Sequence, residues 1–111
     1  MNIATREKDG VTILEPRGKI TIGVGDVALR EAVMGVLNGG ARKVLINLAG
    51  VTTIDSSGIG ELVAAFTTAT NRGAKLKLFN LSAKVNDILQ VTQLVTVFEI
   101  FDSEAEGVAS F

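Results

Sequence analysis

The stretch KVLINLAGVTTIDSSGIGELV, from Lys43 to Val63, contains the pattern that decides the fold. Its first part, Lys43 to Leu48, is an almost continuous apolar run of strand length, which is typical of a central strand covered on both faces. Apolar residues then recur at helical spacing. This predicted helix has an inward stripe of Ile59, Leu62, Val63 and Phe66 and ends at Asn71-Arg72-Gly73.

A second strand is predicted for Lys75 to Leu81, a few residues after the helix ends. A strand, a helix and a strand in this order require a right-handed crossover and a parallel strand pair. The stretch therefore predicts an α/β fold.

The N-terminal part predicts a β-hairpin. Ile3 to Arg6 and Val11 to Glu15 are short and rich in β-branched residues, and Asp9-Gly10 between them is a strong two-residue turn signal. Pro16 has no N–H to donate to a neighbouring strand, so we expect it at a strand end or at an edge position.

A glycine-containing segment, Gly18 to Gly25, predicts a loop before the first helix. We expect Asp26 to cap that helix and Gly39-Gly40 to end it. Its buried stripe is predicted to be Leu29, Ala32, Val33, Val36 and Leu37.

The C-terminal third predicts three further elements. Ser82 opens a short helix with Val85, Ile88 and Leu89 inward, Val95 to Phe101 is predicted to be a strand, and Ser103 to Glu106 has the capping-box spacing of a terminal helix. The whole chain, residues 1–111, is therefore predicted to be a single α/β domain. We expect a mixed, mostly parallel sheet of four or five strands with about four helices.

Composition excludes several classes of function. Eleven basic and twelve acidic residues, spread without runs, leave a net charge of −1, and only 5% of residues are aromatic, so nucleic acid is not an expected direct partner. No apolar run approaches the ~20 residues needed to span a bilayer, so we expect no membrane insertion and a cytoplasmic protein. Without Cys or His, the usual catalytic triads, cysteine nucleophiles and zinc sites are excluded, and no cofactor is expected.

The segment IDSSGIGE, Ile54 to Glu61, lies at the predicted strand-to-helix junction, where backbone N–H groups and the helix dipole favour an anion. Two hypotheses remain open here. Asp55, Ser56 or Ser57 simply caps the helix, or at least one hydroxyl stays free and accessible. A free serine would have only Asp55 as a base, so it is a poor nucleophile, but it could accept a phosphate from another enzyme.

These features resemble the STAS domain family, and within it the single-domain bacterial anti-sigma factor antagonists. The resemblance covers nearly the whole chain. Its most specific part is the motif D-S-S-G-I-G after the strand KVLINL; the other matching parts are Gly18-Lys19-Ile20, Gly73 to Leu78, and the late pattern Thr92, Leu94 and Phe98.

The resemblance implies that Ser56 is phosphorylated by an anti-sigma factor that is also a serine kinase. The unphosphorylated antagonist would bind this kinase and free the sigma factor, and a serine phosphatase would reset the cycle. The chain would then be a regulator and not an enzyme, either a monomer or a weak dimer. The expected partner-binding residues are Thr21, Gly23, Asp55, Ser56, Ser57, Gly58 and Glu61.

Thr21 departs from the family pattern. Many antagonists have Gly-x-Leu-Asp after the second strand, with the Asp helping to contact the kinase, whereas this chain has Gly18-Lys19-Ile20-Thr21. Thr21 is therefore either an ordinary loop residue or a second phosphorylation site.

Other classes of function also stay open at this point. The chief alternative is a STAS accessory subunit of a membrane transport complex, which needs no phosphorylation cycle. A phosphoaspartate receiver is disfavoured because Glu7 and Glu15 do not form the required acidic pair. Gly23-Val24-Gly25 lacks the Lys of a nucleotide-binding Walker motif, and Asp55 with Glu61 is a weak basis for a metal site.

Overall fold

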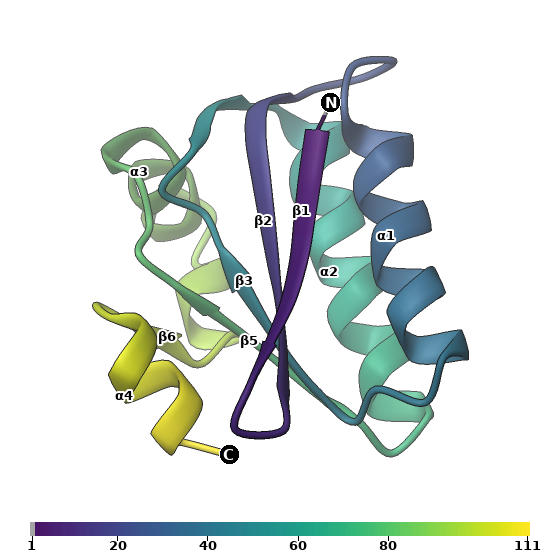
Figure 1. Cartoon of the computed structure of the whole chain (residues 1–111). Helices are drawn as coiled ribbons and strands as arrows, with labels where there is room; N and C mark the ends of the chain where they lie inside the picture. Colours follow the sequence, from purple (N-terminus) through teal and green to yellow (C-terminus); the bar gives the residue numbers. More distant parts are fainter. Residues whose placement is uncertain (1) are drawn as a thin grey trace.

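The structure, a computed structural model that describes residues 2–111, begins with the predicted hairpin (Figure 1). β1 (Asn2–Lys8) pairs antiparallel with β2 (Val11–Ile20). Asp9 and Gly10 both have positive φ, 52° and 81°, as a type I′ turn requires. The turn prediction is confirmed, and both strands are longer than predicted.

The remaining strands are β3 (Lys43–Asn47), β4 (Val51–Ile54), β5 (Lys75–Phe79) and β6 (Ile100–Phe101). The strand order is β1-β2-β3-β5-β6, and β4 pairs with the far end of β2. All pairs except β1 with β2 are parallel. The predicted mixed, mostly parallel sheet is confirmed, and it has six strands because β4 also forms.

Pro16 lies inside β2, where we did not expect it. β2 pairs with β3 at Thr12–Leu14 and with β4 at Gly18–Ile20, so the proline falls between the two parallel pairings. Its missing N–H is tolerated because β2 changes partner there.

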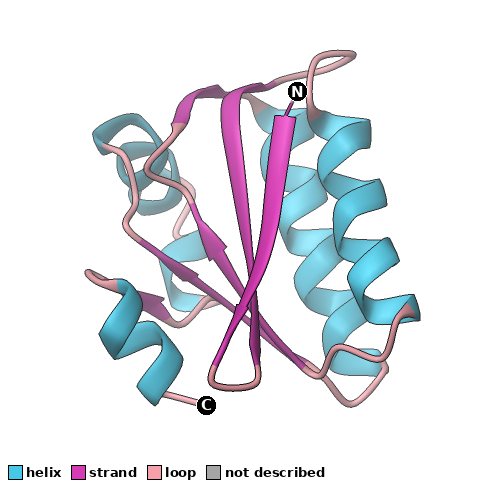
Figure 2. Cartoon of the chain, viewed as in Figure 1, coloured by secondary structure: helices cyan, strands magenta, loops and turns pink. Residues whose placement is uncertain are grey.

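The helices are α1 (Asp26–Asn38), α2 (Ser56–Asn71), α3 (Ala83–Val91) and α4 (Glu104–Ala109), with a short 3₁₀ turn, η1, at Leu94–Thr96. Figure 2 shows α1 and α2 side by side to the right of the strands and α4 on the other side of the molecule, near the C-terminus. The prediction that Asp26 caps α1 is wrong, because Asp26 is the first residue of the helix. Gly25, with φ of 88°, takes the cap position.

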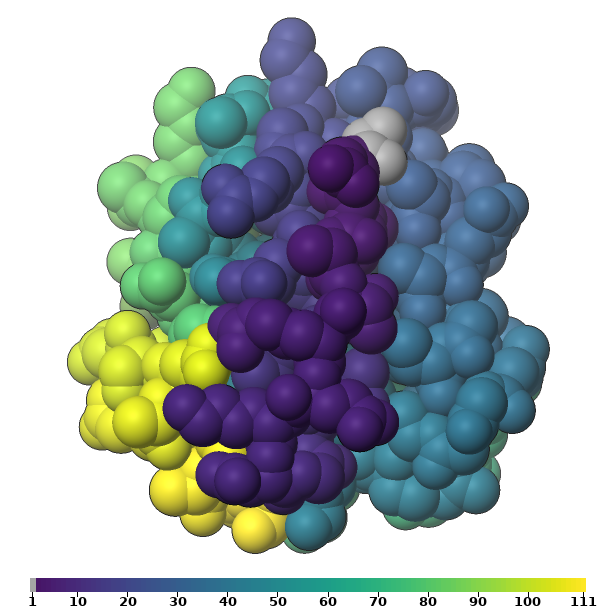
Figure 3. Space-filling view, viewed as in Figure 1, coloured from purple at the N-terminus to yellow at the C-terminus, as the bar shows by residue number. Residues whose placement is uncertain are grey.

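Two apolar clusters fill the two faces of the sheet. The large one joins the sheet to α1, α2 and α3. The small one contains Val11, Ile13, Leu45 and Phe79, with Phe101, Val108 and Phe111 packed against it from the C-terminal segment. Figure 3 shows the side of the molecule where the N-terminal hairpin and this C-terminal segment lie next to each other.

The prediction of a strand over Val95–Phe101 is wrong except for its last two residues. Gln93 has a φ of 62°, η1 follows, and Phe98 turns into the large cluster, where its ring meets Phe66 edge-on at 5.4 Å between centroids. Burial of Phe98 therefore outweighs the strand preference of the segment.

Candidate functional site

The loop after β2 and the loop before α2 meet at one end of the sheet. Ile20 of β2 is the register partner of Ile54 of β4, and the N–H of Asp55 donates to the carbonyl of Ile20 at 3.3 Å. Because the two strands are parallel, both chains leave the sheet at the same edge. Thr21 and Asp55 therefore lie in neighbouring loops.

Asp55 is the cap of α2 and also ties the two loops together. Its Oδ1 accepts the N–H of Gly58 at 3.0 Å, and its Oδ2 accepts the N–H of Ile22, from the other loop, at 3.0 Å. Hydrogen bonds from these two N–H groups stabilise the carboxylate and lower the pKa of Asp55 from its usual value. The bond from Ile22 has the larger effect and the bond from Gly58 the next largest. The side chain is therefore an anion that holds the backbone of both loops.

Ser56 is the first residue of α2 and is exposed. Since Asp55 fills the capping role, Ser56 is not needed for it, and its hydroxyl makes no hydrogen bond to another residue within 2–111. Ser57, the second residue of the helix, is partly buried. Of the two hypotheses for this stretch, the structure supports a cap made by Asp55 and an accessible hydroxyl on Ser56.

Gly58, which we expected among the residues that contact a partner, is instead buried. A Cβ atom there would stand 2.1 Å from the carbonyl oxygen of Ile20 and 2.6 Å from Cγ1 of Ile54. Gly60, by contrast, is exposed, and a Cβ there would meet nothing within 4 Å. Gly58 therefore sets how closely α2 approaches β2, which in turn places Ser56.

Glu61 lies one turn into α2 and is held by α1. Its carboxylate accepts from Nε of Arg30 at 3.1 Å, and its side chain is only 15% exposed. This ion pair joins the second turns of the two helices. Glu61 is thus available to a partner only at the rim of the site, together with Arg30.

The loop that contains Thr21 is a tight turn with an apolar tip. Thr21 and Val24 exchange two backbone hydrogen bonds, of 2.7 and 2.9 Å, and Gly23 has a φ of 71°. Ile22 is 75% exposed and Val24 51% exposed. Sequence reasoning placed Thr21 and Gly23 here but missed these two apolar side chains, although each flanks the glycine in a segment already predicted to be a loop.

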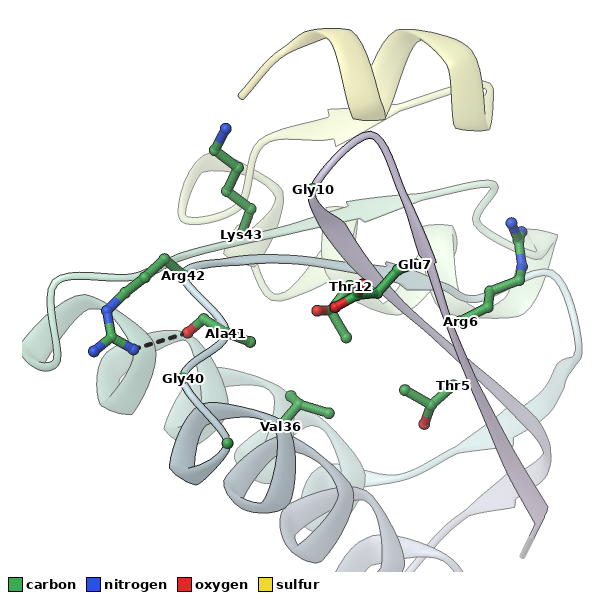
Figure 4. A pocket seen from close by; sticks show the side chains of 11 residues that line it. Thr5, Arg6, Glu7, Gly10, Thr12, Val36, Gly40, Ala41, Arg42 and Lys43 are labelled. Carbon is green, nitrogen blue, oxygen red and sulfur yellow. Dashed lines mark hydrogen bonds between the residues drawn. The ribbon is translucent and has the colours of Figure 1, made fainter.

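Two further features of the molecule bear on its chemistry. Within residues 2–111 no three acidic side chains gather closely enough to hold a metal ion. A polar hollow does lie between β1 and the end of α1 (Figure 4). Thr5, Thr12 and Val36 face it while Arg42 and Lys43 extend away, and it sits where β3 begins, at the opposite end of the sheet from Ser56.

No helix in the described chain is long and apolar enough to cross a bilayer.

Comparisons with known proteins agree with this arrangement. A Thermotoga maritima protein named as a candidate anti-sigma factor antagonist is 27% identical over 99 residues, which are 89% of this chain and 88% of that protein. Its crystal structure superposes with a TM-score of 0.89 over 97% of this chain and 92% of that one. The anti-sigma-B factor antagonist of Listeria monocytogenes is 36% identical over 61 residues, which are 55% of this chain and 54% of that protein.

The phosphorylated form of the Bacillus cell fate determinant SpoIIAA shares the fold, with a TM-score of 0.74, 15% identity and 98% of both chains covered. The family model of the STAS domain matches residues 2–107, almost the whole length described above. This chain therefore belongs to the STAS domain family.

Proposed function

We propose that this protein is an anti-sigma factor antagonist that binds an anti-sigma serine kinase and is switched off by phosphorylation of Ser56. It acts in the cytoplasm, where sigma factors work, and a serine phosphatase restores the binding form. The chain itself is a regulator and not an enzyme. The proposal rests on one observation above all: Ser56 is exposed at the start of α2 while Asp55 fills the capping role.

The modification needs no catalytic group from this chain. Both carboxylate oxygens of Asp55 already accept backbone N–H groups, so the base that takes the Ser56 proton comes from the kinase. The Ser56 oxygen then attacks the γ-phosphorus of ATP, and ADP leaves. Absence of His and Cys is compatible with this role, because the substrate side of a phosphoryl transfer supplies only a hydroxyl.

A phosphate on Ser56 adds roughly −1.5 to −2 charges. The dipole of α2 favours an anion at this end, so the fold tolerates the modification. A partner surface that covers Ser56 would instead bury an uncompensated charge, which costs several kcal/mol. Since 1.4 kcal/mol is tenfold in affinity, phosphorylation ends the complex.

The partner contact combines two chemically different parts. One is the polar start of α2, with Ser56, Ser57 and the rim residue Glu61. The other is the apolar tip of Ile22 and Val24 next to Thr21 and Gly23, held in place by Asp55. Gly58 contributes by packing and not by contact. Many antagonists contact the kinase through an Asp at the position of Thr21. In this chain the apolar tip would supply a contact in place of that Asp.

The test begins with in vitro phosphorylation of the purified chain by serine kinases encoded beside its gene, followed by mapping of the modified residue. We expect label on Ser56 and its loss in Ser56→Ala. Ser57→Ala is the matched control and should still be labelled. Full labelling elsewhere, with none on Ser56, removes the proposal.

Binding provides a second readout. Ser56→Ala should still bind the kinase, whereas Ser56→Asp should bind at least tenfold more weakly with an unchanged melting temperature. If pull-downs instead recover only a permease and its ATPase, and Ser56→Asp leaves that complex unchanged, the alternative role as a transport subunit replaces this one.

A further inference from the structure

The sheet ends on one side at β1, and within residues 2–111 no strand lies beyond it (Figure 1). Every residue of β1 is exposed except Ile3, which is partly buried. The strand at the opposite end of the sheet, β6, has only two residues. β1 is therefore the long open edge of this sheet, the kind of edge to which another strand can add.

The hairpin turn determines which backbone groups of β1 face outward. A two-residue type I′ turn is flanked by two residues that exchange both of their backbone hydrogen bonds, here Lys8 and Val11. The register of the hairpin runs from there without a shift, so every second residue before Lys8 also bonds to β2. The residues between them, Ile3, Thr5 and Glu7, direct their N–H and carbonyl groups away from β2.

The other side of β2 agrees with this assignment. The N–H of Gly18 donates to the carbonyl of Gly50 at 2.9 Å, on the side of β2 that faces β4. Even-numbered residues of β2 therefore point away from β1, and odd-numbered ones point toward it. In the described chain no backbone bond from outside the hairpin reaches Ile3, Thr5 or Glu7. These three residues thus present unpaired donors and acceptors along an open edge.

The two faces of this edge differ in chemistry. On the α1 side, Thr5 and Glu7 line, together with Val36, the polar hollow of about 560 Å³ described above (Figure 4). On the other side, Arg6 is held by Glu104 of α4. An added strand would therefore find space for its side chains on one face and a cation that is already neutralised on the other.

We propose that β1 pairs antiparallel with β1 of a second copy of this chain, so that the two sheets join across a two-fold axis at Thr5. Thr5 then lies opposite Thr5 of the second copy, and Ile3 lies opposite Glu7. Each of these pairs exchanges two backbone hydrogen bonds, which satisfies all the outward groups. A second copy fits this edge because its outward residues are placed symmetrically about Thr5.

Charge selects this register over its neighbours. An axis at Arg6 would place two guanidinium groups opposite each other, and an axis at Glu7 would do the same with two carboxylates. An axis at Ala4 avoids both but shortens the ladder, since fewer residues of β1 then have an opposite residue. With the axis at Thr5, Arg6 faces Ala4 and no like charges meet across the two strands.

This dimer leaves the proposed kinase site free. Ser56 follows β4 at the end of the sheet where β2 also ends. Because the two β1 strands run antiparallel, the two copies direct these ends in opposite directions. Each copy can therefore bind its own kinase molecule, and phosphorylation of Ser56 does not disturb the pairing.

Sedimentation of the full chain at rising concentration tests the pairing. We expect a monomer–dimer equilibrium with a dissociation constant on the order of 0.1 mM. Thr5→Pro removes an N–H that points outward and not toward β2, so the variant should keep its melting temperature but dimerise roughly tenfold more weakly or less. Ser56→Asp should dimerise as the unchanged protein does.

Opposed charges at the axis give a second test. Thr5→Lys and Thr5→Glu each place two like charges opposite each other, so each variant alone should be monomeric. An equal mixture of the two should form a heterodimer, because lysine then faces glutamate. Thr5 is exposed, so both variants should fold.

Cross-linking reads the register directly, because the chain contains no cysteine. Opposite Cα atoms in a hydrogen-bonded pair are about 5.5 Å apart, so Thr5→Cys should form a disulfide-linked dimer on oxidation. Glu7→Cys is the matched control on the same face. Its counterpart in the second copy lies about 13 Å away along the strand, so it should stay unlinked.

Three results would overturn the proposal. The first is a chain that stays monomeric at all concentrations up to about 1 mM. The second is a dimer that Thr5→Pro and the charged variants leave unchanged, since such a dimer would use another surface. The third is equal cross-linking of Thr5→Cys and Glu7→Cys. None of these results bears on whether Ser56 is phosphorylated.

Discussion

Near their starts, α2 and α4 each pack against the sheet through a buried glycine, but the atoms that the two glycines face differ. Each helix is capped by the residue before it, with Asp55 bonded to Gly58 and Ser103 bonded to Glu106. Each also places a buried glycine against the sheet. At Gly58 an added Cβ would meet a backbone oxygen of Ile20 at 2.1 Å, whereas at Gly107 it would meet the end of the Leu45 side chain at 2.8 Å.

The contrast extends to what holds each helix. α2 has sixteen residues with an apolar stripe in the large cluster. α4 has six residues, and polar links reinforce its small cluster: Glu104 contacts Arg6 and Lys8, while Ser110, just after α4, accepts from Lys77. Backbone contact fixes the position of α2 and thus of Ser56, whereas side chains that can adjust hold α4. We therefore expect the start of α2, where the proposed phosphorylation site lies, to be more rigid than α4.

The largest effect should come from Gly58→Ala. The methyl group collides with backbone that cannot move without disturbing the β2–β4 pairing, so we expect a net loss of about 2 kcal/mol in the free energy of unfolding. Urea denaturation measures it. Gly60→Ala is the matched control on the same helix and should gain up to about 1 kcal/mol from helix propensity, since its Cβ meets nothing. Equal effects at the two glycines would contradict this account of the contact.

Gly107→Ala tests the other half of the comparison. The Leu45 side chain can rotate away from the new methyl group, and the helix gains propensity, so we expect a net change within about 1 kcal/mol of zero. The same denaturation experiment checks it. A loss as large as that of Gly58→Ala would mean that α4 is held as rigidly as α2.

A smaller and more local effect is expected from Asp55→Ala. Loss of both acceptors frees the N–H groups of Ile22 and Gly58, so their hydrogen exchange should become about tenfold faster while the core amides keep their rates. Asp55→Asn retains one acceptor oxygen and should fall between. Unchanged exchange at Ile22 would show that the Thr21–Val24 turn is rigid without Asp55.

The smallest effect is the response to acid. Hydrogen bonds from Arg6 lower the pKa of Glu104, and those from Ile22 and Gly58 lower the pKa of Asp55, from ordinary values of 4.5 and 3.8. Folded values below the unfolded ones give stability that is full above these pH values and is lost as pH falls through the folded pKa.

Thermal melts from pH 6 down to pH 3 check this dependence. Because the Glu104 pair is near the surface, its share should be a few tenths of a kcal/mol. Glu104→Gln removes the share of α4 and leaves that of α2. If Glu104→Gln loses as much stability in acid as the unchanged protein does, the loss comes from carboxylates other than Glu104.

Much of the fold could be predicted from local sequence signals. Asp9-Gly10 predicts its turn because both residues tolerate positive φ, and Ser103 to Glu106 predicts a cap that the structure contains. Val95–Phe101 was predicted wrongly because strand preference is local while burial of Phe98 against Phe66 is not. Pro16 was unexpected inside a strand because only the sheet order shows that β2 changes partner there.

The same division applies to the site. The residue types of Asp55, Ser56 and Ser57 before a helix determined by themselves that a cap and a hydroxyl would stand at an anion-favouring end, since capping is a contact between near neighbours in the chain. Only the tertiary structure decided which residue caps, that Gly58 is buried, and that Ile22 bonds to Asp55. Those outcomes depend on β2 lying beside β4, a contact between segments about thirty residues apart that no local pattern specifies.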